Sequence, residues 1–167
     1  MKKVSMRKFF LLGAVLMMAL FAACSKDSQT YDPVPQFNRD VDSIKAYLAK
    51  NNLVAKQDTV SGIFYNISKI GNGVDSVKST MSQIKALYTG QLLSGKVFDS
   101  TGTTPRDLGY AGGLIKGFQF ALTRITKGGK IRVYLPSYYG YGPAENKDIP
   151  ANSVLIFDVE LTDVTNP

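Results

Sequence analysis

The chain has 167 residues, of which 44% are hydrophobic and 20% are charged. It is therefore long enough and apolar enough to form one globular domain with a packed core. It contains no His, no Trp and one Cys, which excludes Ser-His-Asp triads, Cys-His catalytic pairs, His-ligated metal sites and disulfide frameworks. The chemistry of the protein must rest on carboxylates, hydroxyls, the backbone and aromatic side chains.

The formal charge of +7 is concentrated at the N-terminus. Residues 1–23 hold four basic residues and no acidic one, so the rest of the chain carries 16 basic against 13 acidic side chains. A small basic excess without a stripe of Lys and Arg argues against a nucleic-acid partner.

The first 23 residues have the pattern of a lipoprotein signal peptide. A basic segment precedes the apolar run Phe9–Ala23, whose length suits a signal peptide and is short for a spanning helix. The run ends at Phe21-Ala22-Ala23-Cys24, which resembles the bacterial lipobox, although Phe21 replaces the usual aliphatic residue. We expect residues 1–23 to be removed and Cys24 to be lipidated, which anchors the domain to a membrane. The alternative is an uncleaved single-pass anchor.

The residue after the cysteine bears on location. Ser25 stands where an Asp signals retention at the inner membrane in some bacteria. We therefore expect the outer membrane, with the domain facing the periplasm or the cell surface.

Residues 24–38 are polar, contain two prolines and show no hydrophobic period. This composition predicts a flexible tether between the lipid and the domain.

A short helical extension is predicted for residues 39–56. Asp40 or Asp42 would cap the helix, which would end near Asn51-Asn52. The helix either packs on the domain or contributes to a dimer contact. Its apolar residues at helical spacing are Val41, Ile44, Tyr47 and Leu48.

Beyond Leu53 the hydrophobic period changes to two, which predicts antiparallel strands with one solvated face each. Four segments show the alternation: residues 63–68, 82–92, 130–136 and 154–161.

One segment between these strands has a helical period instead. Ile115, Phe118, Leu122 and Ile125 form one apolar stripe, and Gly128-Gly129 follows it. A single short helix among antiparallel strands predicts an α+β domain with the helix packed across the concave face of the sheet.

Five strings in the second half of the chain resemble the FKBP-type peptidyl-prolyl cis-trans isomerases. The similarity covers about residues 57–164 and is specific because the strings agree in both order and spacing. They are Tyr88-Thr89-Gly90, Gly95-Lys96-Val97-Phe98-Asp99-Ser100, Leu114-Ile115-Lys116-Gly117-Phe118, Tyr139-Gly140-Tyr141-Gly142 and the run from Ile149 to Leu161.

This resemblance implies an FKBP-like domain over residues 57–167, with a twisted antiparallel sheet wrapped round one short helix. It also implies a shallow aromatic pocket that holds a proline ring, with no cofactor and no metal. The partners implied are proline-containing segments of exported proteins and a macrolide ligand.

The resemblance also assigns the pocket residues. Catalytic positions fall on Tyr88, Phe98, Asp99, Tyr141 and Phe157, and substrate-binding positions on Leu114, Ile115, Phe118 and Ile149. In the family pattern the Tyr141 hydroxyl and the Ile115 N–H bind substrate carbonyls, and Asp99 orients the Tyr88 hydroxyl without acting as a general base. Each assignment has a plainer alternative, since Phe118 and Phe157 would also fit a core and Asp99 would also fit a turn cap.

The sequence departs from the family pattern at three places. Phe118 stands where many members place Trp. The segment 101–108 lacks the aromatic residue that usually completes one wall, for which Tyr110 is a candidate substitute, and the loop 143–148 is altered. Two functions follow as alternatives: an active prolyl isomerase, or a non-catalytic, lipid-anchored chaperone or peptide-binding module of the same fold.

Overall fold

The computed structural model describes residues 33–167. The predicted signal peptide (residues 1–23), the predicted lipidation site Cys24 and residues 24–32 of the predicted tether lie outside the described residues. No helix within residues 33–167 is long and apolar enough to cross a membrane.

Seven strands form one antiparallel sheet, which confirms the α+β fold class. Their spatial order is β1-β2-β6-β7-β3-β4. Strand β5 pairs with the N-terminal part of β3, on the same edge of β3 that pairs with β4 nearer its C-terminal end. The strands are β1 (Lys56–Gln57), β2 (Phe64–Lys69), β3 (Gln83–Leu92), β4 (Val97–Ser100), β5 (Arg106–Tyr110), β6 (Lys130–Leu135) and β7 (Leu155–Thr165).

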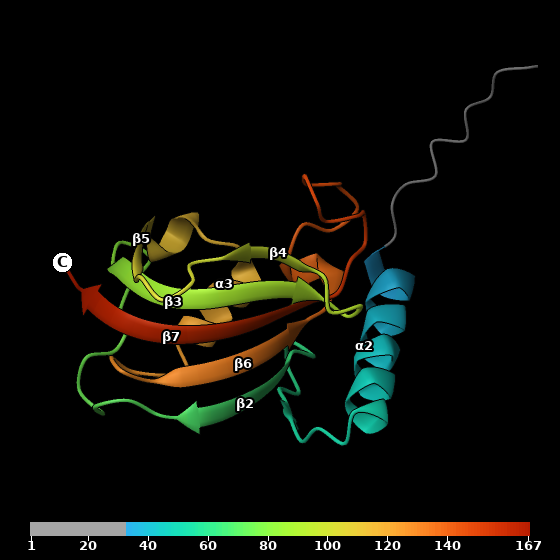
Figure 1. The fold of residues 1–167 in the computed structure, drawn as a ribbon, viewed down its shortest axis with the longest axis horizontal. Helices are drawn as coiled ribbons and strands as arrows, with labels where there is room; N and C mark the ends of the chain where they lie inside the picture. The colour runs from blue at the N-terminus through green and yellow to red at the C-terminus, as the bar shows by residue number, and fades with distance from the viewer. Residues whose placement is uncertain (1–32) are drawn as a thin grey trace, which may run out of the picture. The chain divides into compact units, whose positions relative to one another are not determined.

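Helix α3 (Lys116–Leu122) lies against one face of the sheet, as its apolar stripe predicts (Figure 1). Its buried residues pack on the inward side chains of β3, β6 and β7. Gly117 makes the close approach possible, because a Cβ atom there would lie 2.3 Å from a methyl carbon of Leu135. The main core of the domain therefore lies between α3 and the concave face of the sheet.

Helix α2 (Pro33–Lys50) begins before the predicted helical extension. Residues 33–38, which the sequence analysis assigned to the tether, are its first turns. Pro33 is suited to a first helical position because its missing N–H has no intrahelical partner there and its φ is already helical. Asp40 is in the middle of the helix, so the prediction that Asp40 or Asp42 caps it is wrong.

The C-terminal end of α2 has a left-handed residue. Asn52 has φ of 53°, and the Leu53 N–H donates to the Leu48 carbonyl at 2.9 Å. This pattern terminates a helix in the usual way, since Asn tolerates the left-handed conformation.

Helix α2 packs on the domain, along the end of the sheet where β6 finishes and β7 starts (Figure 1). Val41, Ile44 and Leu48 meet Tyr134 and Ile156, which point away from the main core. The sequence analysis expected this second face to be solvated, yet Tyr134 is only 2% exposed and Ile156 is fully buried. The expectation fails here because α2 covers that part of the face.

Candidate functional site

A cavity of about 560 Å³ opens beside α3 on the concave side of the sheet. Its lining contains all nine residues that the sequence analysis assigned to the pocket: Tyr88, Phe98, Asp99, Leu114, Ile115, Phe118, Tyr141, Ile149 and Phe157. They come from β3, β4, β7, α3 with the segment that precedes it, and the loop between β6 and β7.

Edge-to-face aromatic contacts build the floor of the cavity. The Phe157 ring centroid lies 5.5 Å from that of Phe98 and 5.4 Å from that of Phe118, with interplanar angles of 81° and 83°. Tyr88 meets Phe118 at 5.5 Å and 84°. These distances and angles are typical of favourable aromatic pairs. The floor is therefore apolar and fixed by mutual ring packing, with Phe157 in contact with three other rings.

Gly90 allows the rings to lie against β3. A Cβ atom at this position would be 2.6 Å from two ring carbons of Phe98 and 2.8 Å from one of Phe157. The register pairs Gly90 with Asp99 on one side and with Phe157 on the other. The absence of a side chain at Gly90 thus makes room for two rings of the cavity floor, Phe98 and Phe157.

A polar cluster forms one edge of the cavity. The Tyr88 hydroxyl donates to the Asp99 carboxylate, and the Arg106 guanidinium donates to the Tyr88 oxygen at 2.8 Å. Arg106 Nη1 also forms an ion pair with Asp99 at 3.4 Å. These bonds hold the Tyr88 ring in place and pair Asp99 with Arg106, so the carboxylate is arranged to orient Tyr88.

Among the hydrogen-bond donors of the lining that have no protein acceptor within residues 33–167, two bear on peptide binding. One is the Tyr141 hydroxyl, and the other is the backbone N–H of Ile115, which precedes the first residue of α3. Donors left open at an apolar cavity can bind carbonyl oxygens of an extended peptide.

The family model for FKBP-type peptidyl-prolyl cis-trans isomerase matches residues 76–162. The chain belongs to this family. It is 38% identical over 124 residues to the isomerase FkpA of Buchnera aphidicola subsp. Schizaphis graminum, with 73% of this chain and 49% of the relative covered. It is 40% identical over 134 residues to a probable FKBP-type isomerase of Haemophilus influenzae, with coverage of 79% and 54%.

Solved structures of FKBP-type proteins have the same fold. The crystal structure of FkpA from Escherichia coli superimposes with a TM-score of 0.64 at 26% identity, covering 98% of this chain and 75% of that one. The crystal structure of AtFKBP13 gives 0.58 at 31% identity, covering 67% and 99%. The chain spans about half the length of the two curated relatives named above.

The wall that lacks the usual FKBP aromatic residue is made by Arg106 and Leu108. Tyr110, the candidate substitute, is outside the cavity lining and 50% exposed. The β3–β5 register explains why: Ile84 pairs with Gly109 and Lys85 with Asp107, so Leu108 is an extra residue that breaks the alternation. Sequence reasoning missed Arg106 because only the pairing of β5 with β3 brings it beside Tyr88.

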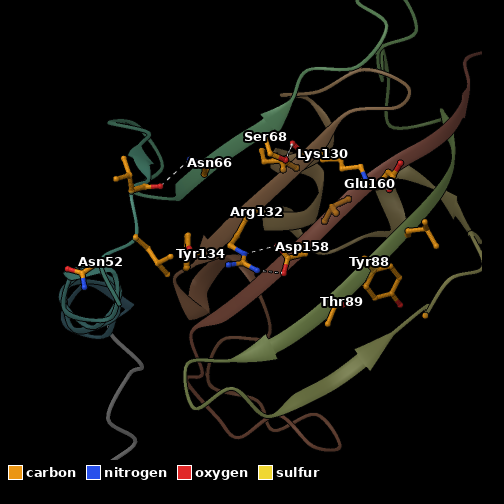
Figure 2. A pocket seen from close by; sticks show the side chains of 16 residues that line it. Asn52, Asn66, Ser68, Tyr88, Thr89, Lys130, Arg132, Tyr134, Asp158 and Glu160 are labelled. Carbon is orange, nitrogen blue, oxygen red and sulfur yellow. Dashed lines mark hydrogen bonds and ion pairs between the residues drawn. The ribbon is translucent and has the colours of Figure 1, made fainter. Parts of the chain in front are cut away.

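A second cavity, also of about 560 Å³, lies on the opposite face of the sheet (Figure 2). Its charged residues are paired with each other: Arg132 Nε with Asp158 at 2.6 Å, and Lys130 with Glu160 at 2.9 Å. The part of its lining that the structure describes therefore offers no unpaired charge to a ligand. Of the two cavities, the one beside α3 combines an apolar floor with open donors.

Tyrosine ionisation should limit the stability of this FKBP domain at high pH. Burial, followed by the hydrogen bond to Asp99 and the charge of Asp99, raises the pKa of Tyr88 to about 12, although Arg106 acts to lower it. Burial, and then the charge of Asp99, raises the pKa of Tyr141, and burial is also the main cause that raises the pKa of Tyr134 and Tyr139.

Because these pKa values are higher in the folded state, the unfolded chain loses its tyrosine protons first as the pH rises. The stabilisation is complete below the ordinary tyrosine pKa of 10.0 and should be lost between that value and about 12. We expect the free energy of unfolding in urea to be level from pH 7 to 9 and to fall at pH 10, 11 and 12. Tyr88→Phe should show a smaller fall, and an equal fall in both proteins would contradict the role given to Tyr88.

Proposed function

We propose that the protein is a peptidyl-prolyl cis-trans isomerase that accelerates X-Pro bond rotation in exported proteins. The observation that carries the proposal is the aromatic cavity with open donors at Tyr141 Oη and Ile115 N–H. The aromatic floor is suited to a proline ring, and the donors are suited to the carbonyl groups of the chain on either side. The same cavity is our candidate site for a macrolide ligand.

The proposed mechanism needs neither a nucleophile nor a general base. The barrier to amide rotation is about 18–20 kcal/mol because resonance keeps the peptide bond planar. As the bond twists, the resonance and the charge separation between oxygen and nitrogen decrease, so an apolar cavity favours the twisted state over the planar one. Phe98, Phe118 and Phe157 supply this environment, while Tyr141 and Ile115 fix the chain on either side of the rotating bond.

Tyr88, Asp99 and Arg106 have a supporting role in the proposal. Their hydrogen bonds fix the Tyr88 ring against Phe118. Burial, and then the negative charge of Asp99, raises the pKa of Tyr141, which extends the pH range over which its hydroxyl is a donor.

The decisive experiment measures the cis-to-trans rate of a short X-Pro peptide with the purified full chain in detergent. We expect acceleration by the wild type, and we expect Tyr141→Phe to lower kcat/KM by about three- to tenfold, the usual effect of one hydrogen bond. Tyr138→Phe is the matched control, because Tyr138 is 59% exposed and outside the cavity lining. A folded wild type that leaves the rate at its uncatalysed value would refute the isomerase proposal. Proline-peptide binding and suppression of aggregation would then test the non-catalytic alternative.

We also propose that the protein is a lipoprotein anchored through Cys24 to the outer membrane. The support is the basic segment, the apolar run and the Phe21-Ala22-Ala23-Cys24 string, with Ser25 following. We expect a labelled fatty acid to be incorporated into the wild type and the labelled protein to sediment with outer membranes. Cys24→Ala should incorporate none, and Cys24→Ser gives the same test with a closer side-chain match. An unlabelled wild type would contradict the proposal.

A further inference from the structure

Helix α2 reaches the loop that carries Tyr141 through one buried carboxylate. Asp40 is only 3% exposed. Its Oδ2 atom accepts hydrogen bonds from the backbone N–H of Ser137 at 2.8 Å and from the Ser137 hydroxyl at 2.6 Å. Its Oδ1 atom accepts from Gln36 Nε2 at 2.6 Å. Both oxygens of the carboxylate are thus used, and two of the three bonds join residues 97 positions apart in the chain.

Ser137 is the first residue of the 3₁₀ helix η3 (Ser137–Tyr139), which has no side-chain cap of its own. Asp40 accepts from the first N–H of η3 and so acts as the cap from another element. Removal of Asp40 would leave a buried N–H and a buried hydroxyl without acceptors, since Ser137 is 1% exposed.

The hydrogen bonds continue from Ser137 into the pocket loop. The Ser137 carbonyl accepts from the N–H groups of Gly140 and Gly142, each at 2.9 Å. The Gly142 carbonyl in turn accepts from the Asn152 N–H at 2.7 Å. Tyr141 stands between the two glycines, so the backbone on both of its sides is bonded to Ser137.

Aromatic packing strengthens the same contact. Phe37, one turn before Asp40 on α2, meets Tyr139 edge-to-face at 6.5 Å. Gly62 packs against the Phe37 ring, where a Cβ atom would lie 2.5 Å from the ring. The N-terminal half of α2 is therefore fixed to η3 by both a polar and an apolar contact.

We propose that Asp40 is a positioning residue for isomerisation: through Ser137 it fixes the loop that presents Tyr141 to the substrate. Asp40 lies well outside the segment 76–162 that matches the family model, and its hydrogen-bond partners Gln36 and Ser137 are not in the cavity lining. The inference rests on the proposed isomerase function for its effect on activity, while the effect on the loop is measurable without it.

The test compares Asp40→Ala, Asp40→Asn and Leu48→Ala in the full chain in detergent. Leu48 lies eight residues after Asp40 on α2, about 12 Å along the helix, and contacts the sheet through the Tyr134 and Ile156 cluster. Leu48→Ala therefore weakens the packing of α2 but leaves the Asp40–Ser137 bonds in place. Asp40→Asn keeps one acceptor oxygen for Ser137 and is the conservative variant.

Hydrogen exchange followed by mass spectrometry gives the first readout. We expect Asp40→Ala to raise exchange in the peptide covering residues 137–143 by tenfold or more relative to β7, and Asp40→Asn to restore most of the protection. Leu48→Ala should raise exchange in α2 without this selective effect. Wild-type exchange at 137–143 in Asp40→Ala, or the same pattern in Leu48→Ala, would overturn the inference. If Asp40→Ala does not fold, Ser137→Ala decides by the same comparison, because it removes one of the two bonds and keeps the N–H.

Peptide kinetics give the second readout. Since the loop holds the peptide in both the ground state and the transition state, we expect KM in Asp40→Ala to rise by about three- to tenfold, no more than the loss of the Tyr141 hydroxyl itself, with a smaller change in kcat. A fall in kcat alone would contradict the proposal that Asp40 positions the loop. A KM in Asp40→Asn as high as that in Asp40→Ala would contradict it as well. A wild type with no activity would refute the proposed function, and the exchange data would still decide whether Asp40 fixes the loop.

Discussion

Replacement of Phe157 by leucine should reduce kcat/KM for an X-Pro peptide by about two orders of magnitude, the effect expected when a reacting group is displaced by about 1 Å. Phe157 contacts the rings of Tyr88, Phe98 and Phe118, and is 4% exposed. Leucine fills much of the volume but has no ring edge or face, so the three other rings lose their common partner. Because hydrophobic swaps of similar volume are tolerated, the free energy of unfolding should fall by less than about 1.5 kcal/mol.

Phe157→Ala extends the same series. It removes most of the side chain, and we expect the free energy of unfolding to fall by about 3–5 kcal/mol. The control is Val159→Ala, two residues later on the same face of β7, which is buried but outside the cavity lining. It should destabilise the protein and leave kcat/KM near the wild-type value under folding conditions. If Phe157→Leu retained full activity, the aromatic floor would have no part in the reaction.

The strands and α3 were predictable because each has a regular period and a partner of its own. On β6, Ile131, Val133 and Leu135 alternate as expected and all lie in the main core. The resemblance placed the pocket residues because five separate strings fix their order along the chain. Neither source of information depends on a contact between distant segments.

The errors arose where distant segments meet. Tyr134 looked like a solvated position because the alternation along its own strand carries no information about α2. This helix lies more than eighty residues earlier in the chain and covers Tyr134. The segment 33–38 looked like a tether because its prolines suggest irregular structure, whereas Pro33 only begins the helix. Arg106 gave no signal and Asp40 was mistaken for a helix cap, because each acts through a partner set by the tertiary fold: Tyr88 for Arg106 and Ser137 for Asp40.

The short strands β4 and β5 were missed for a related reason. They have four and five residues, and Leu108 interrupts the alternation of β5. Both depend on pairing with the long strand β3, which no local period reveals. Because of the same break in the alternation, Leu108 lines the cavity and Tyr110 lies outside it.

Gly90→Ala should also reduce kcat/KM by about two orders of magnitude, although alanine is the better residue for a strand in general. The added Cβ atom would be 2.6 Å from Phe98 and 2.8 Å from Phe157, well inside contact distance. The Phe157 ring is held by Tyr88 and Phe118, and the Phe98 ring packs on Phe157, so both rings must shift together by a substantial part of an ångström. We expect a loss of about 1–3 kcal/mol in the free energy of unfolding from this overpacking.

Thr89→Ala is the matched control, because Thr89 immediately precedes Gly90 on β3, points to the opposite face of the sheet and contacts Ser100 rather than the cavity. Its activity should stay close to that of the wild type. The double variant Gly90→Ala with Phe98→Ala identifies the cause, since removal of one ring relieves the clash. Its loss of stability should be smaller than the sum of the two single losses. Additive losses would show that Gly90 acts through something other than the Phe98 ring, and an active Gly90→Ala would show that the rings of the floor can move without effect on the reaction.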